Sequence, residues 1–192
     1  RQQGVQDNWG HGFNSAPRLN WKISEDESAS LQAFLQKGYW RNRQTYVANE
    51  GTSNAVLDDD ALNKGTWQNA RLNAQWSRRI DEERKLELKL GAGDSRGTFD
   101  NQTFRDGAVR RRTVGDNHDQ SITQSGKYAQ LLGESHSVSL GWDLEWRRRD
   151  EDRTTSEQGQ ILLPDFDAQP FGARIRRMAW YLQDDWELSP QW

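Results

Sequence analysis

The sequence predicts an all-β protein, an antiparallel up-and-down meander of about seven long strands that forms part of a transmembrane β-barrel. Apolar and polar residues alternate with a period of two, and tight polar turns recur between the alternating stretches. The alternation is also long, lasting 11 residues from Ser137 to Arg147. Strands of soluble domains run about 5–6 residues, whereas a tilted strand needs about 9–11 residues to cross a bilayer. Length therefore favours a membrane barrel over a soluble sandwich.

The clearest strand lies at residues 137–149. Successive side chains of a strand point to opposite faces, so one face carries Val138, Leu140, Trp142, Leu144 and Trp146. The same alternation predicts the strands 18–23, 29–47, 66–79, 84–99, 120–132 and 174–188. In the strand 29–47, Phe34 and Trp40 fall on the face opposite to Leu31 and Leu35.

Connections of two kinds separate these strands. Short polar turns are predicted at residues 24–28, 80–84, 132–136 and 188–191, and long polar outer loops at residues 48–64, 97–119 and 150–172. Short turns at one end and long loops at the other are typical of outer-membrane barrels. The whole chain, residues 1–192, is expected to be one partial β-barrel segment.

Composition excludes several other classes. No run of 18 or more apolar residues exists, so a transmembrane helix is not expected. The chain contains no cysteine, which excludes disulfide scaffolds, thiolate zinc sites and cysteine nucleophiles. Its 26 basic and 29 acidic residues are interleaved, so no nucleic-acid partner is expected. Only 33% of the residues are hydrophobic, which fits a barrel because its lumen and loops are polar.

Tryptophan placement gives a further indication. Trp21, Trp76 and Trp186 all lie close to a predicted short turn, where an aromatic belt at a membrane interface would be found; packing in a core or turn is the alternative. Seven strands would leave two open edges, and unpaired backbone groups in lipid cost several kcal/mol each. We therefore expect a fragment whose isolated form dimerises, closes on itself or buries its apolar face in detergent.

Two motifs resemble a known family. The stretch Ala179-Trp180-Tyr181-Leu182-Gln183-Asp184-Asp185-Trp186-Glu187-Leu188-Ser189-Pro190-Gln191 resembles the Y-x-Q-D-x-W-x-L-S-P strand and turn of TonB-dependent outer-membrane receptors. Leu140-Gly141-Trp142-Asp143 is similar to a motif of their barrel strands. The resemblance implies a middle section of the barrel without the plug, in the outer membrane of a Gram-negative bacterium. It also implies uptake of a ferric siderophore or another small ligand, with TonB acting through the plug and with outer-membrane lipid around the barrel.

The sequence contains no catalytic or metal-binding motif. We therefore expect that the chain is not an enzyme and that it binds no cofactor or metal. His11, His118 and His136 lack metal-ligand spacing. The Gly91–Gly97 stretch misses the dinucleotide-binding pattern. The run Asp58-Asp59-Asp60 lacks the spacing of a calcium loop.

Candidate ligand-binding residues are arginines and tryptophans near the long-loop ends of the strands: Arg110, Arg111, Arg112, Arg147, Arg149, Trp40 and Trp67. Guanidinium groups suit carboxylate, phosphate or catecholate oxygens, and indole rings stack on ligand rings. The alternative for the arginines is pairing with Asp150, Glu151 or Asp152, or with lipid A phosphates. For the tryptophans the alternative is anchoring at the rim.

The leading hypothesis is thus a segment of a TonB-dependent receptor that binds a ferric siderophore and passes it through a gated barrel. A second hypothesis is a soluble Trp-rich β-domain that binds carbohydrate by stacking. A third is an autotransporter-like or porin-like barrel, which shares the lipid face but needs no specific ligand.

Overall fold

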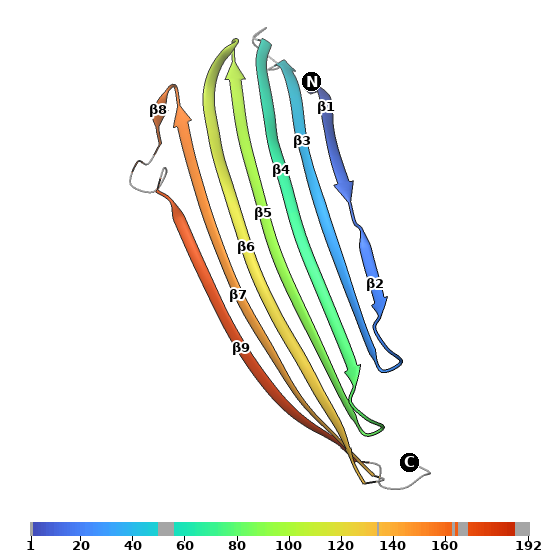
Figure 1. Cartoon of the computed structure of the whole chain (residues 1–192). Helices are drawn as coiled ribbons and strands as arrows, with labels where there is room; N and C mark the ends of the chain where they lie inside the picture. Colours follow the sequence, from blue (N-terminus) through green and yellow to red (C-terminus); the bar gives the residue numbers. More distant parts are fainter. Residues whose placement is uncertain (1, 50–55, 134, 163, 165–168, 187–192) are drawn as a thin grey trace.

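The computed structural model is one open, curved layer of antiparallel strands (Figure 1). It describes residues 2–49, 56–133, 135–162, 164 and 169–186. Within these ranges the strands are β1 (Gln2–Ser15), β2 (Arg18–Lys22), β3 (Glu27–Asn49), β4 (Val56–Arg79), β5 (Arg84–Arg105), β6 (Ala108–Leu132), β7 (His136–Glu157), β8 (Gln160–Ile161) and β9 (Phe171–Trp186). The predicted all-β antiparallel meander is confirmed.

The strands β1 and β2 together form one edge strand along β3. β1 pairs with residues 35–48 of β3, and β2 pairs with residues 28–32. They are separated at Pro17, which has no N–H group to donate to the sheet but whose carbonyl accepts a hydrogen bond from the Ala33 N–H at 3.0 Å. Each of the seven predicted strands therefore overlaps one long strand, and the first of these begins at Gln2 instead of Arg18.

Residues 97–119 differ most from the prediction, because they continue β5 and β6 instead of forming a long loop. A two-residue turn, Asp106–Gly107, joins the two strands, and both residues have positive φ, 51° and 77°. Such a turn matches the twist of a hairpin and favours Asp-Gly. Backbone pairing extends the strands here although neither face is apolar, which is why the alternation of apolar residues does not mark them.

The other two predicted outer loops are also shorter than expected within the described residues. Residues 56–64 belong to β4, while residues 50–55 lie outside the described part of the chain. β7 continues to Glu157 and turns at Gln158–Gly159, again with two positive φ values, into β8. The tight turns at the opposite end are present between β2 and β3, β4 and β5, and β6 and β7; the turn predicted at 188–191 lies outside the described residues.

The ends of the strands are staggered by about one residue per strand. Glu27 is the first residue of β3, and following paired residues from it across four strand-to-strand steps leads to Leu140 on β7. Leu140 lies four residues beyond His136, the first residue of β7. The row from Arg84, the first residue of β5, reaches Val138, two residues beyond His136, after two steps. A strand rises about 3.3 Å per residue, and neighbouring strands lie about 4.8 Å apart. A stagger of one residue per strand therefore tilts the strands by about 35° from the perpendicular to the line that joins the tight turns. Strands of membrane barrels are tilted by about 35–45°.

The sheet has no hydrophobic core among the described residues. No apolar side chain is buried there, whereas Ser139 and Thr155 are. No described segment is a helix long and apolar enough to span a membrane. The layer therefore leaves both of its faces, and the outer edges of β1, β2 and β9, without a partner in the described chain.

Candidate functional site

An apolar band crosses one face of the sheet from β2 to β9. The register brings alternate residues of neighbouring strands into common rows, and these rows form the band: Leu19, Trp21, Ala29, Leu31, Ala33, Leu35, Ala70, Leu72, Ala74, Trp76, Leu86, Leu88, Leu90, Ala92, Ile122, Tyr128, Val138, Leu140, Trp142, Leu144, Trp146, Met178, Trp180 and Leu182. In the two central rows, those of Leu31 and Ala29, Gln124 and Gly126 of β6 are the members that lack an apolar side chain. We call this surface the apolar band.

Polar and charged residues bound the apolar band at both ends. On β7 the band covers residues 138–146, and on β5 it covers residues 86–92. These seven to nine residues span about 23–30 Å along a strand, or about 19–24 Å in height at the inclination of about 35°. Outer-membrane barrels carry an apolar band about 25 Å tall.

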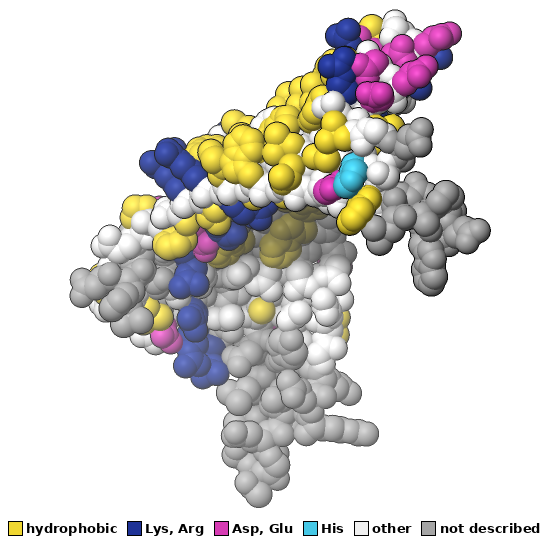
Figure 2. Space-filling view, turned by 90° about the horizontal axis from the view of Figure 1, so that it is seen from below, with side chains coloured by type: hydrophobic (Ala, Val, Ile, Leu, Met, Phe, Trp, Pro, Cys, Tyr) yellow, Lys and Arg dark blue, Asp and Glu magenta, His cyan; other side chains and the backbone are white. Residues whose placement is uncertain are grey.

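The apolar band is exposed. Met178 is 68% exposed, Trp180 62% and Leu182 74%, and Leu90 is 56% exposed. Figure 2 shows hydrophobic side chains gathered along one side of the molecule, next to Lys and Arg side chains. Contiguous apolar patches larger than a few hundred Å² are rare on soluble monomers, so this face is built to be covered.

Aromatic side chains follow the edge of the apolar band nearest the tight turns. Trp21 and Trp76 lie in one row, on either side of Ala29. The Trp76 indole N–H donates a hydrogen bond to Glu27 at 2.8 Å. Trp186 stacks on His136 with ring centroids 5.3 Å apart. Rings with one apolar side and one polar contact are the arrangement found at membrane interfaces.

The opposite face, which we call the polar face, is rich in hydroxyl, amide, charged and glycine residues. Its residues alternate along each strand with those of the apolar band, and they include Arg71, Asn73, Gln75, Lys89 and Thr123. Ion pairs connect neighbouring strands of this face. Arg177 of β9, for example, lies 3.0 Å from Asp143 and 3.3 Å from Glu145 of β7.

Trp40 and Trp67, predicted to stack on a ligand, both lie on the polar face over glycines. The Trp67 ring covers Gly38 so closely that a Cβ on Gly38 would collide with it, and it also reaches Gly12. The Trp40 ring covers Gly65 in the same way, with its Nε1 2.7 Å from the position of a Cβ there. Both glycines are buried, so each indole has one ring face packed on the sheet.

Arg147 and Arg149 are brought together on the polar face around Asp119 of β6. Arg147 lies 3.7 Å and Arg149 3.6 Å from the carboxylate of Asp119, and Arg149 also pairs with Glu151 at 3.0 Å. The row of Trp67 reaches Glu151 on β7, three strand spacings or about 14 Å away. The predicted tryptophans and arginines therefore form two separate groups on one face.

The other three predicted arginines lie at one end of β6, but they differ in the face of the sheet that they occupy and in their partners. Arg110 lies at a register shift, 3.6 Å from Glu157, and Arg111 faces the polar side. Arg112 lies on the face of the apolar band and makes two hydrogen bonds of 2.9 Å to Asp100. Chiefly because of these hydrogen bonds, the pKa of Asp100 is lowered to about 2, so this pair stays ionised at neutral pH.

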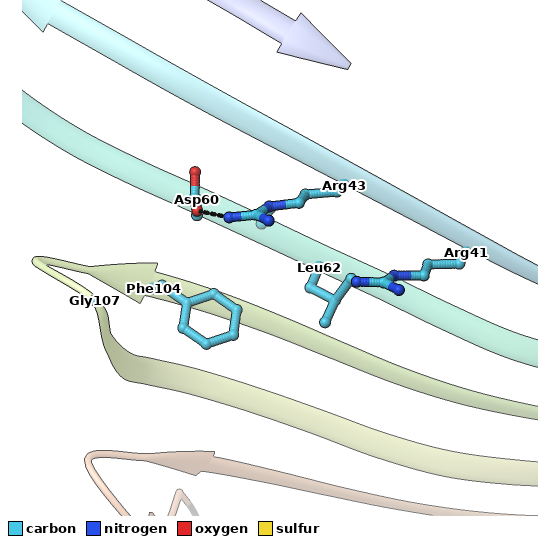
Figure 3. Close-up of a pocket in the computed structure, with 7 residues that line it drawn as sticks. Arg41, Arg43, Asp60, Leu62, Phe104 and Gly107 are labelled. Atoms are coloured by element: carbon cyan, nitrogen blue, oxygen red, sulfur yellow. Dashed lines mark hydrogen bonds and ion pairs between the residues drawn. The ribbon is translucent and has the colours of Figure 1, made fainter. Parts of the chain in front are cut away.

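A hollow of about 360 Å³ lies beyond the apolar band, at the ends of β3, β4 and β5 (Figure 3). It is lined by Arg41, Arg43, Asp60, Ala61, Leu62, Phe104 and Gly107. Arg43 pairs with Asp60 at 2.8 Å. Sequence patterns do not predict this site because its residues come from three strands in a region without apolar alternation. Within the described residues, no group of three or more His, Cys, Asp and Glu side chains is placed to hold a metal ion.

Comparison with known proteins finds similarity among solved structures. No protein-family model matches the chain, and no curated protein matches it. Among solved structures, the chain is similar to the crystal structure of the ferric yersiniabactin uptake receptor FyuA from Yersinia pestis, with a TM-score of 0.47 and 8% sequence identity. The match covers 85% of this chain and 27% of that receptor, so the chain spans about a quarter of the receptor's length.

Proposed function

We propose that this chain is a section of the wall of an outer-membrane TonB-dependent receptor, which takes up a ferric siderophore or a similar iron complex by ligand binding and gated transport, without covalent chemistry. The apolar band carries the proposal. It is continuous over the sheet, exposed, and bounded by polar residues at a height close to that of a bilayer core.

Three further features support a place in a barrel wall. The stagger of about one residue per strand corresponds to the tilt of membrane barrel strands. The open edges at β1, β2 and β9 need further strands, because unpaired backbone groups are costly in lipid. The resemblance of residues 179–191 to TonB-dependent receptors supports the family and the class of ligand.

A soluble carbohydrate-binding domain is less well supported. A sugar platform combines exposed rings with polar groups that bind hydroxyls, whereas Trp142 and Trp180 lie among Leu140, Leu144 and Met178. Trp40 and Trp67 have one ring face packed on glycine. A soluble sandwich also needs a second layer over the apolar face, and the described residues provide none.

Cysteine labelling tests the assignment of the two faces, since the chain has no cysteine of its own. In phosphatidylcholine vesicles, we expect Leu90→Cys and Met178→Cys to react with a lipid-soluble maleimide and to be protected from a charged one. Lys89→Cys and Ala179→Cys, the adjacent positions on the polar face, should show the reverse. Equal reaction of all four with the charged reagent would contradict the proposal of a membrane wall.

The arginine pair on the polar face tests the ligand class. We expect a ferric tris-catecholate complex to bind the chain and Arg147→Gln with Arg149→Gln to weaken binding about tenfold or more, because a hydrogen bond to a charged group contributes about 1.5–3 kcal/mol. Fluorescence quenching titrations would measure this. Arg148→Gln, the residue between them on the other face, is the control. If it weakens binding equally, the polar face is not the ligand face.

A further inference from the structure

Three arginines meet directly above the apolar band on β7 and β9. Arg148 and Arg174 are direct partners across the two strands, and Arg176 is the partner of Trp146. All three lie on the face of the apolar band, at the end away from the tight turns. We call Arg148, Arg174 and Arg176 the arginine cluster.

Like charges directly opposite each other across two strands destabilise a sheet. Arg148 has a partner in Asp150, with Nε 2.7 Å from Oδ2. Arg174 and Arg176 are exposed, and neither forms a hydrogen bond or ion pair with any residue that the structure describes. Three guanidinium groups and one carboxylate leave a charge of about +2 that the described residues do not neutralise.

The surface below the cluster is apolar and continuous with it. Trp146 lies opposite Arg176, and the next row pairs Leu144 with Met178. Above the cluster, Asp150 faces Gly172, which has no side chain, and the nearest atom to a Cβ on Gly172 would be an oxygen of Asp150 at 3.4 Å. A molecule that lies here meets an apolar surface at one end and guanidinium groups at the other.

We propose that the arginine cluster binds the phosphate headgroup of a membrane lipid whose acyl chains lie on Met178, Trp180 and Leu144. A phosphate carries one to two negative charges and several acceptor oxygens, which match the excess charge and the forked donors of the arginines. The cluster lies where the apolar band ends, which is the depth of headgroups in a leaflet. This inference rests on the proposed place of the chain in a membrane wall.

The test uses the chain in dodecylmaltoside micelles, titrated with dioctanoyl phosphatidic acid and, separately, with dioctanoyl phosphatidylcholine. We expect a preference for phosphatidic acid that Arg174→Gln with Arg176→Gln reduces about 25- to 30-fold, because each basic residue near a headgroup contributes about 1 kcal/mol, or about fivefold. Arg18→Gln with Lys22→Gln removes the same charge from the polar face of β2 and is the matched control.

Inorganic phosphate separates a lipid site from a simple anion site. At the same concentration it should not displace phosphatidic acid, because it lacks the acyl chains. Equal competition by inorganic phosphate, an unchanged preference in the arginine variant, or an equal loss in the control would each overturn the proposal. Partition of the chain into phosphatidylcholine vesicles tests the membrane wall separately: a chain that inserts without preferring phosphatidic acid contradicts this inference alone.

Discussion

Leu72→Arg is expected to lower the free energy of unfolding by about 2–4 kcal/mol when the chain is embedded in a bilayer. Leu72 lies on β4 near the middle of the apolar band, between Ala33 and Ala92, and its side chain is 44% exposed. A guanidinium at this depth leaves water without gaining a partner. Urea titration of the chain in phosphatidylcholine vesicles, followed by tryptophan fluorescence, measures the change.

Asn73→Arg is the matched control, because Asn73 is the next residue of β4, is also exposed, and lies on the polar face between Gln32 and Gly91. There a guanidinium stays hydrated, so we expect a change within about 0.5 kcal/mol. An equal loss at both positions would mean that both faces are buried in protein. No loss at either would mean that the apolar band does not lie in lipid.

Gly38→Ala is expected to lower the free energy of unfolding by about 1–3 kcal/mol, because the added Cβ collides with the Trp67 ring and overpacks the site. In a Trp67→Ala background the same change should be neutral or should stabilise by up to about 1 kcal/mol, because alanine restricts the unfolded chain more than glycine does. A double-mutant cycle with urea titrations should therefore give a coupling energy of about 1–3 kcal/mol.

Gly172→Ala serves as the control for the cycle, since no ring covers Gly172 and a Cβ there would be 3.4 Å from its nearest neighbour. We expect it to have little effect with or without Trp67. If Gly38→Ala costs the same in both backgrounds, Gly38 is needed for its backbone and not for the ring that lies on it. In that case packing on Gly38 would not be the function of the Trp67 ring, and contact with a ligand would be the role to test next.

The strands with an apolar band could be predicted from sequence because alternation is a local property. In residues 137–149 successive side chains point to opposite faces of the strand, and this does not depend on which strand it pairs with. Residues 97–119 could not be predicted in this way, because both of their faces are polar and apolar residues therefore do not alternate with polar ones. Asp106–Gly107, a common hairpin pair, is the signal in the sequence that marks their turn.

The candidate site depended much more on pairing between strands. Arg110, Arg111 and Arg112 are adjacent in sequence, yet a register shift and the pleat direct them to different surroundings. Trp67 and Gly38 are far apart in the chain and meet because β3 and β4 pair in one register. Arg148 and Arg174 likewise become neighbours through the pairing of β7 with β9.

By itself the sequence determined that the chain forms long antiparallel strands and which side chains of each strand share a face, because both follow from the two-residue period of an extended backbone. Only the tertiary structure decided that these separate apolar rows join into one band, where that band ends, and which charges lie together above it. Register decides all three, because it fixes which residues of neighbouring strands lie opposite each other, and a shift of one residue would move every side chain of a strand to the other face.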